Sequence, residues 1–481
     1  MSLLSSLSSS ASALSAYDRA LTVVQNNVTN SSTPGYATQR LDLNAKPFDP
    51  ANGLDGGVQA GSVESSRNEF AEAAVERAQT ALGAVTQQSS SLTDIQNALN
   101  LSDSSGIPAT LGNLFQSFSA WSEDPSSTAN QQAVLQSAQQ VVDSFQATAS
   151  NLAQVRQDTE RQISQSVDQI NAYAQQLQSY NVQIRNGDLN DAALDAQIHT
   201  TLENLSQVVN FTYTVAADGT VSVLVGGQTP LVMGDQQYNL SDQIAAPANL
   251  PPGTPSVPPS ATILDAAGRD ITAEISGGQL SALLATHNQT LASLLGDASQ
   301  PGQLNQLAQA VADRVNQLLT AGNISDGPPP VAGVALFAYD TTNATNVAAT
   351  LSVNPDITPD QLAAIDPGPP YVSNGTALKL AALANPQDPA DEIGNVSYVN
   401  YYGNLAADVG RQLSAANDQQ NIQQQVVAQA QSARQQISGV SLDEQAALLI
   451  QYQRAYQANA QLFQVLNSIT EAAVNLMQPT G

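Results

Sequence analysis

The sequence predicts a mainly α-helical chain with an inserted β-rich region, whose N- and C-terminal helices pair as a coiled coil. Apolar residues recur at helical spacing near both ends. One central run keeps that spacing for about sixty residues, and strand-like alternation is confined to the middle of the chain. We therefore expect an elongated helical-bundle rod domain and a central α+β domain between the paired ends.

The N-terminal helix is predicted from two apolar rows, each with a seven-residue step. The rows are Leu7, Leu14, Leu21 and Val28, beside Leu3, Ser10, Tyr17 and Val24. This spacing is typical of a helix that is buried along a narrow stripe. A turn signal, Ser-Ser-Thr-Pro-Gly at 31–35, should end the helix near Asn30.

Long helices follow and predict the rod domain, which we assign to residues 37–208 and 393–439. One helix should run from about Asn68 to Leu99 with Phe70 on its apolar face. After an apolar segment at 111–121, Asp124-Pro125 opens the longest helix, which should stop at Gly187. About sixty residues at ~1.5 Å each give a rod of ~90 Å. A further amphipathic helix covers 194–208.

The central strand-rich domain is assigned to residues 209–392. Alternating apolar residues on either side of Asp218-Gly219 predict a β-hairpin at 211–225. A second hairpin is expected at 263–275, after a proline-rich loop at 247–259. Two helices should follow, at 280–295 and 304–318, and then short strands at 334–339 and 350–353.

Helix returns from about Val396 to Ile437 and breaks at Gly439. Ser441 and Glu444 form a capping box that starts the last helix, so residues 1–36 and 440–481 are assigned to a terminal coiled-coil domain. Its apolar rows are Leu442, Leu449, Tyr456 and Phe463, beside Leu448, Ala455, Leu462, Ile469 and Leu476. Because more than one face is apolar, we favour contact between subunits over core packing for Tyr452 and Tyr456.

Composition excludes several classes of partner. The 481 residues include 41 acidic and 14 basic side chains, for a net charge of −27. This charge disfavours nucleic acid and anionic membranes as partners. Only 11% of residues are charged, against about 25% in an average domain. A weakly charged polar surface suits close packing of many related subunits, although genomic bias explains it about equally well.

No targeting segment or reactive centre is predicted. The N-terminus lacks a signal-peptide pattern, and no run approaches about 18 apolar residues. The chain has no cysteine and only two histidines, so we expect no catalytic residue, no metal site and no cofactor. His287 has helical spacing from Leu283 and Leu291 and should border a core. The acidic segment 186–191 fits a helix stop and a new cap better than a calcium loop.

Two motifs at opposite ends of the chain resemble one protein group. Residues 26–36, Asn-Asn-Val-Thr-Asn-Ser-Ser-Thr-Pro-Gly-Tyr, resemble the N-terminal motif of the rod, hook and hook-associated proteins of bacterial flagella. Residues 438–444, Ser-Gly-Val-Ser-Leu-Asp-Glu, followed by 451–460, resemble the C-terminal motif of that group. Gln445 departs from the pattern, because a second acidic residue is common there. Chain length and the block Leu114–Phe145 are most similar to the hook-associated protein 1 family, the first hook–filament junction proteins.

The resemblance implies a structural role on the flagellum. It implies export of an unfolded chain without a cleaved signal, and a ring-like zone of subunits between hook and filament with the terminal helices innermost. Expected partners are the hook protein, the second junction protein, further copies of the chain, and a cytoplasmic export chaperone at the C-terminal helix. Localisation would be extracellular, at the hook–filament junction.

Candidate assembly residues are the apolar side chains of both end helices and the motif residues between them. The predicted interface is Leu3, Leu7, Leu14, Tyr17, Leu21, Val24, Val28, Leu442, Leu449, Tyr452, Tyr456, Leu462, Phe463 and Ile469. The predicted motif and turn residues are Asn26, Asn27, Asn30, Pro34, Gly35, Tyr36, Gly439, Ser441 and Glu444. Two helices with a narrow seam bury too little apolar surface to offset the entropy of ordering them. We therefore hypothesise that both ends order only against neighbouring subunits.

Other functions stay open at this point. A related axial subunit, such as hook protein or the second junction protein, would show a different middle region, so the block 114–145 discriminates. A flagellum-associated cell-wall hydrolase would need a cleft with paired carboxylates, and no acidic pair stands out in the sequence. An extracellular adhesin would use the central strands.

Overall fold

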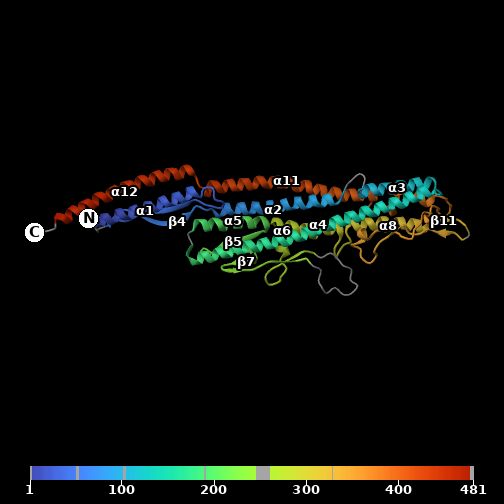
Figure 1. Cartoon of the computed structure of the whole chain (residues 1–481), viewed down its shortest axis with the longest axis horizontal. Coiled ribbons are helices and arrows are strands. Elements are labelled where there is room, and N and C mark those ends of the chain that lie inside the picture. The colour runs from blue at the N-terminus through green and yellow to red at the C-terminus, as the bar shows by residue number, and fades with distance from the viewer. Residues whose placement is uncertain are drawn as a thin grey trace.

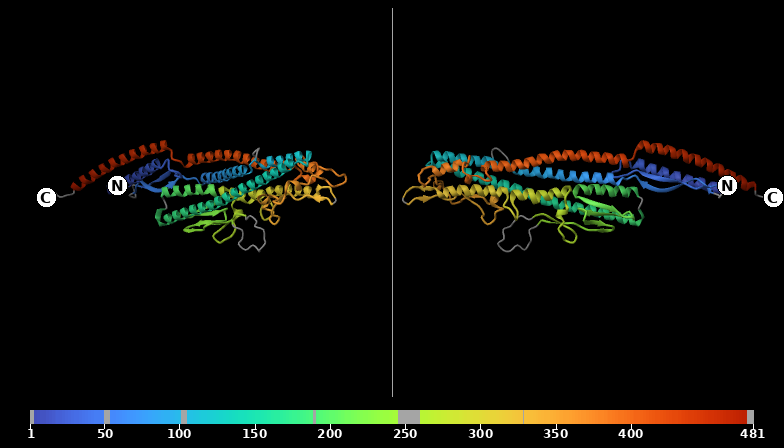
Figure 2. Two further views of the ribbon diagram at one scale, coloured as in Figure 1. Left: turned by 45° about the vertical axis from the view of Figure 1, so that its right-hand side comes forward. Right: turned by 180° about the vertical axis from the view of Figure 1, so that it is seen from behind.

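The chain folds into a long rod of helices that continues at one end into a thinner helix pair (Figures 1 and 2). This computed structural model describes residues 3–49, 54–100, 105–188, 191–244, 260–327 and 329–476. The thin end contains both ends of the described chain, and the strands between residues 211 and 233 lie along one side of the rod. The predicted class, mainly α with an inserted β-rich region, is confirmed.

The thin end is an antiparallel pair of α1 (Leu3–Thr29) and α12 (Leu442–Leu476). Asn27 contacts Gln445 near the rod, and the rings of Tyr17 and Tyr452, whose centroids are 6.3 Å apart, lie farther out. A hairpin of β1 (Gln39–Ala45) and β4 (Val58–Ser65) packs against α1, and β2 (Phe48–Asp49) and β3 (Leu54–Asp55) extend it. The sequence therefore predicts the helix pair, while the hairpin comes only from the structure.

The buried stripe of α1 is displaced from the predicted leucine rows. Among the side chains of α1 that the structure describes, the buried ones are Ser10, Ala13, Ala16, Ala20, Val24 and Asn27. Most are small, so α1 can approach α12 and the hairpin closely. Of the predicted rows, only Ser10 and Val24 are buried, the other described members are half-buried, and Val28 is exposed.

The described helices of the segments assigned to the rod lie side by side along it. They are α2 (Glu69–Ala98), α3 (Ile107–Glu123), α4 (Thr128–Gln183), α5 (Ala192–Val208) and α11 (Tyr398–Ser438). At 56 residues, α4 spans about 84 Å. It ends in a π-helical segment, Ile184–Asp188, where Gly187 has φ +119°, and Asp191 caps α5 as predicted. One expectation is wrong: Phe70 is 85% exposed, because α2 packs through the side that contains Val75 and Ala78.

Two apolar cores lie one after the other along the rod. The distal core centres on α3 and α4, with Phe118, Trp121 and Phe145 fully buried, and it includes side chains of α8 (Gln303–Ala321), α10 (Gly375–Ala382) and α11. The other core begins on α4 at Ile163 and joins α5 to the central sheet. The central region is therefore packed along the rod and does not form a detached globular unit.

The central sheet consists of β5 (Phe211–Val215), β6 (Val221–Val225), β7 (Thr229–Met233) and β8 (Gln236–Gln237) in sequence order. The hairpin predicted at 211–225 is confirmed, with Phe211 opposite Val225. The second predicted hairpin is present in a shorter form, because Leu264 bridges Asp270 in antiparallel fashion and the Ile271 N–H donates to the Ile263 carbonyl across the turn at 265–268. β10 (Thr262–Leu264) pairs with β9 (Ser241–Gln243), and the Asp270 carboxylate accepts from the Thr272 N–H, which turns the chain into a 3-10 helix, Thr272–Glu274.

Short elements complete the fold. α6 (Gly278–Ala285), a π-helix (Thr286–Leu291) and α7 (Ala292–Leu295) form the first predicted central helix, and α8 is the second. β13 (Phe337–Ala338) pairs with β14 (Ser352–Val353), within the two predicted strand segments. β11 (Asn323–Ser325) pairs with β12 (Val331–Ala332), α9 covers Val347–Thr350, and 3-10 turns cover Pro359–Gln361 and Pro389–Asp391. The loop predicted at 247–259 lies outside the described residues.

Candidate assembly interface

The last helix exposes apolar side chains on more than one face. Leu442, Tyr456, Leu462 and Ile469 are between 37% and 55% exposed. Ile450, Val465 and Val474 are also exposed, while Leu449, Tyr452 and Phe463 are half-buried against α1. A single partner helix cannot cover so wide an apolar surface. α12 therefore has apolar area that no other described part of the chain covers.

The predicted residues of α1 lie beside that surface. Leu7, Leu14, Tyr17 and Leu21 are half-buried, and the Leu3 side chain lies outside the described set. Among the motif residues, Asn26, Pro34, Ser441 and Glu444 are exposed, whereas Asn30, Gly35, Tyr36 and Gly439 are half-buried. The Ser441 hydroxyl accepts from the Glu444 N–H, which supports the predicted start of α12.

Asn27 connects four segments at the base of the helix pair. Its side-chain amide donates to the Gln39 carbonyl at 2.8 Å and to Gln445 Oε1 at 3.0 Å. Its side-chain oxygen accepts from the Gln39 N–H and the Tyr36 hydroxyl, each at 2.9 Å. Asn27 is 1% exposed, so this one amide fastens α1, the turn, β1 and α12 together.

The turn at 30–36 packs tightly against α5. Gly35 has φ +72°, and a Cβ at this position would lie 2.4 Å from Thr200 Oγ1 and 2.5 Å from the Ala196 carbonyl oxygen. Thr200 also donates to the Pro34 carbonyl at 3.3 Å. Glycine is therefore required both for the backbone angle and for the close approach. We use the term joint for this turn together with the start of α2, the middle of α5 and the α11–α12 junction.

Two arginines tie the joint to the rod. The Arg67 guanidinium donates to the Gly35 carbonyl at 2.6 Å and pairs with Glu72 and Asp195, each at 2.7 Å. Arg434 of α11 pairs with Glu72 at 3.1 Å and with Glu203 of α5 at 2.7 Å. The four ion pairs are mostly buried, and both arginines pair with Glu72. The turn, α2, α5 and α11 therefore form one ionic network.

Burial shifts the pKa of two groups next to this network. Desolvation, with the charges of Arg67 and Arg434, lowers the pKa of His199 to about 3, so its imidazole is neutral. Its ring lies edge-on to Tyr213, and its Nδ1 is buried without a hydrogen-bond partner among the residues described. Desolvation, with the charges of Glu72 and Glu203, raises the pKa of Glu76 to about 7.

Glu76 should make the stability of the chain depend on pH. A carboxyl group whose folded pKa lies above its unfolded value stabilises the fold below about pH 4.5, and that stabilisation is lost as pH rises through 7. Glu76→Gln should therefore match the parent near pH 4 and be more stable by about 1–3 kcal/mol at pH 8. Urea unfolding at both pH values measures the difference. The exposed Glu69→Gln is the control, and an equal effect of both variants at pH 8 would contradict the assignment.

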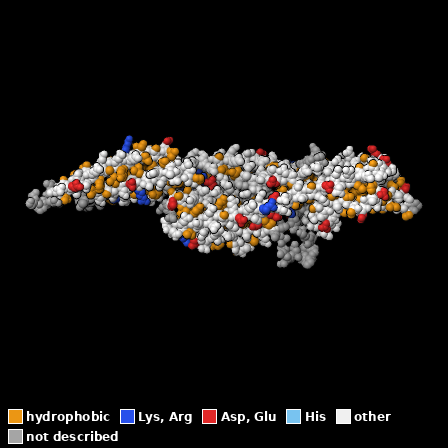
Figure 3. Space-filling model, viewed as in Figure 1, with side chains coloured by type: hydrophobic (Ala, Val, Ile, Leu, Met, Phe, Trp, Pro, Cys, Tyr) orange, Lys and Arg blue, Asp and Glu red, His pale blue; other side chains and the backbone are white. Residues whose placement is uncertain are grey.

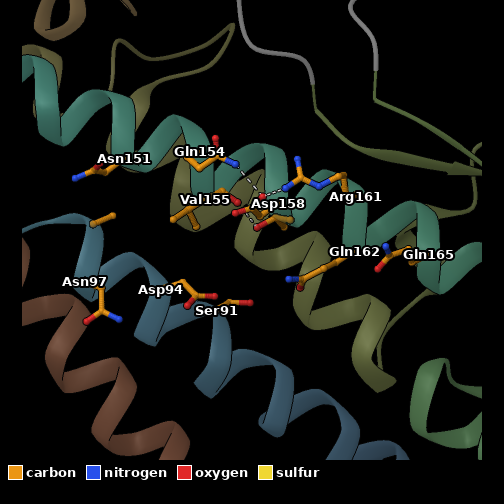
Figure 4. A pocket seen from close by; sticks show the side chains of 12 residues that line it. Ser91, Asp94, Asn97, Asn151, Gln154, Val155, Asp158, Arg161, Gln162 and Gln165 are labelled. Atoms are coloured by element: carbon orange, nitrogen blue, oxygen red, sulfur yellow. Dashed lines mark hydrogen bonds and ion pairs between the residues drawn. The ribbon is translucent and has the colours of Figure 1, made fainter.

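Away from the joint, a polar groove of about 550 Å³ lies between α2 and α4 (Figure 4). Asp94 on α2 lies across the groove from Asp158 on α4. Arg161 and Gln154 of α4 both donate to the Asp158 carboxylate. The Asp158 carboxylate is therefore engaged by two donors from its own helix.

His287, the second histidine, is buried in the rod. Its ring nitrogens contact Glu160 at 3.1 Å and Asn288 at 2.9 Å, in agreement with the predicted place at a core. Within the described ranges, no three His, Cys, Asp or Glu side chains gather where a metal ion could bind. None of the helices described is long and apolar enough for a membrane span.

Sequence reasoning found the motif but missed its partners in the rod. The network joins three segments that are far apart in sequence, and no spacing rule connects them. The segments contain Arg67 and Glu72, Asp195 and Glu203, and Arg434. The small number of basic residues could have pointed to this network, because two of only 14 basic side chains lie in it. Gln445, a departure from the motif, also has a defined role as an acceptor for Asn27.

Comparisons with known proteins agree with this architecture. A family model described as the flagellar hook-associated protein FlgK helical domain matches residues 92–337, about half of the chain. A second model, for the C-terminal part of the flagellar basal body rod FlgEFG proteins, matches residues 431–476, which include the α11–α12 junction.

Relatives that match over nearly the whole chain are named flagellar hook-associated protein 1. Flagellar hook-associated protein 1 of Bacillus subtilis (strain 168) is 24% identical, with 98% of this chain and 97% of the relative covered. That of Escherichia coli (strain K12) is 26% identical, with 97% and 98% covered.

A solved structure shows the same fold. The flagellar hook junction protein FlgK from Burkholderia pseudomallei has a TM-score of 0.64 at 16% identity, covering 76% of this chain and all of that one. The chain belongs to the flagellar hook-associated protein FlgK family, structural components of the hook–filament junction that associate with other axial proteins of the flagellum.

Proposed function

We propose that this chain is a junction subunit that polymerises through its paired end helices. The supporting observation is the wide apolar surface of α12, which α1 covers only on one side. Figure 3 shows hydrophobic side chains gathered more densely over the thin end than over the middle of the rod. Apolar area of this extent on an otherwise polar chain is typical of a protein–protein interface.

The neighbours that we propose follow from the family. The terminal pairs of several copies would form a ring-like zone, with the hook protein on one side and the second junction protein on the other. We infer export of the unfolded chain without a cleaved signal. In the cytoplasm, an export chaperone would cover the apolar faces of α12, because such faces aggregate when left exposed.

We also propose that the ends and the rod differ in their dependence on assembly. Residues 1–36 with 440–481 form the assembly domain, residues 37–208 with 393–439 form the rod, and residues 209–392 form the central domain. The rod has two buried cores of its own, whereas α1 and α12 share a thin seam of small side chains. The ends should therefore become fully ordered only against neighbouring copies.

The test is a pair of charges on the exposed face of α12. Leu462→Asp with Ile469→Asp should leave the soluble subunit folded, because both side chains are about half exposed, and should abolish its incorporation into flagella. Immuno-electron microscopy and the amount of subunit released into the medium measure incorporation. Limited proteolysis of the dilute parent should trim both ends, and assembled subunits should resist.

The control changes exposed apolar residues elsewhere. Val215 and Met233 lie on the central sheet and are about half exposed, so Val215→Asp with Met233→Asp adds the same charges far from α12. This control should assemble like the parent. Normal incorporation of the α12 variant would overturn the proposal, and so would ends that resist protease in a dilute monomer.

A further inference from the structure

α11 has an exposed apolar strip on the half of the helix nearest the joint. Ile422 is 53%, Val426 40% and Ile437 54% exposed, and Ala433 is exposed between them. Steps of four, seven and four residues place these four side chains on one face of the helix. The side facing α2 is different, because it carries Val427, Arg434 and Ser438. These four side chains are called the outer strip below.

The helix around the outer strip is almost free of charge. Between Arg411 and Arg434 the only charged residue is Asp418, and eight of the 22 residues from 412 to 433 are glutamine. Each glutamine amide both donates and accepts, so a surface rich in them can hydrogen-bond to an identical surface. A chain with a net charge of −27 repels its own copies except where its surface lacks charge. These properties fit a second copy better than a basic partner.

The outer strip also continues the apolar surface of α12. Ile437 and Leu442, which is 55% exposed, lie on either side of the break at Gly439. Phe70, 85% exposed, lies at the same level on α2, since the Asn68 N–H bonds to the Ser438 hydroxyl. A neighbour that covers α12 near the joint would therefore also meet the start of the rod.

We propose that the outer strip is a lateral contact with a neighbouring copy of this chain, so that copies adhere along part of the rod as well as at their ends. This proposal rests on the proposed function, because it needs an assembled ring. It assigns α11 a role that the terminal motifs do not imply. Buried apolar side chains supply the attraction, and the glutamines around them pair without leaving a buried charge.

The test introduces charge into the strip. Ile422→Asp with Val426→Asp should leave the thermal unfolding of the soluble subunit nearly unchanged, because both side chains are exposed. The amount of subunit in purified flagella should fall about tenfold, the effect of a modest loss of contact energy for each copy. Val215→Asp with Met233→Asp is the matched control and should incorporate like the parent.

A photo-crosslink identifies the occupant. With p-benzoylphenylalanine in place of Ile422, irradiation of intact flagella should give an adduct that contains two copies of this chain, identified by mass spectrometry. The same group in place of Met233 should give none. Adducts only with another protein, or normal incorporation of the charged strip variant, would overturn the proposal. The Leu462→Asp, Ile469→Asp variant runs in parallel, and its normal incorporation would instead sink the proposed function.

Discussion

Asn27→Leu should release the end helices from the joint and lower the free energy of unfolding there by about 3 kcal/mol. Leucine is close in size but can neither donate nor accept. The Gln39 N–H, the Gln445 side-chain oxygen and the Tyr36 hydroxyl would lose their shared partner in a place that water barely reaches. Each unsatisfied buried polar group costs about 1–3 kcal/mol, and part of that is recovered by relaxation toward solvent.

Hydrogen exchange of α1 and α12 in assembled flagella, where both ends should be ordered, measures this effect locally, whereas a global melting curve would dilute it. The variant should exchange amides of both helices faster while the rod remains protected. Asn26→Leu is the matched control, because the neighbouring Asn26 is exposed. Equal exchange in the two variants would mean that the Asn27 amide does not hold the segments together.

Gly35→Ala should be about as damaging, with a loss of about 3 kcal/mol and a displaced turn. A residue with a Cβ at φ +72° costs about 1 kcal/mol. The added carbon would also lie 2.5 Å from the backbone oxygen of Ala196, which cannot rotate away as a side chain could. The turn must shift, and the Arg67 bond to the Gly35 carbonyl would be lost with it.

A substitution at Gly268 separates the cost of the positive φ angle from the cost of the contact with α5. Gly268 has φ +79°, and within the part of the chain that the structure describes no atom lies within 4 Å of the position of an added Cβ. Gly268→Ala should therefore cost only about 1 kcal/mol. Urea unfolding of both variants measures the difference, and incorporation into flagella should fail for Gly35→Ala alone. Similar losses from both would show that the backbone angle, not the contact with α5, explains the requirement for glycine.

Local signals in the sequence account for most of the fold. The 3.6-residue spacing of α4, the Asp218-Gly219 turn and the Gly439 break are each encoded by neighbouring residues, and the structure agrees with all three. The predictions that failed concern partners. Phe70 has the spacing of a core residue, yet none of the described helices covers its side of α2. The strand at 262–264 also pairs, beside the predicted hairpin, with β9, which precedes the proline-rich segment, and spacing along the chain cannot indicate that second partner.

By itself, the sequence determined where the helices begin and end, that both ends are apolar stripes, and which flagellar motif they contain. Only the tertiary structure decided that Asn27 bonds to a residue 418 positions away and that two arginines fasten the turn to the rod. Helical periodicity is set by contacts between residues a few positions apart, so it can be recognised in the sequence of a single chain. An amide or ionic network depends on which helices lie side by side, and that follows from the packing of the whole chain.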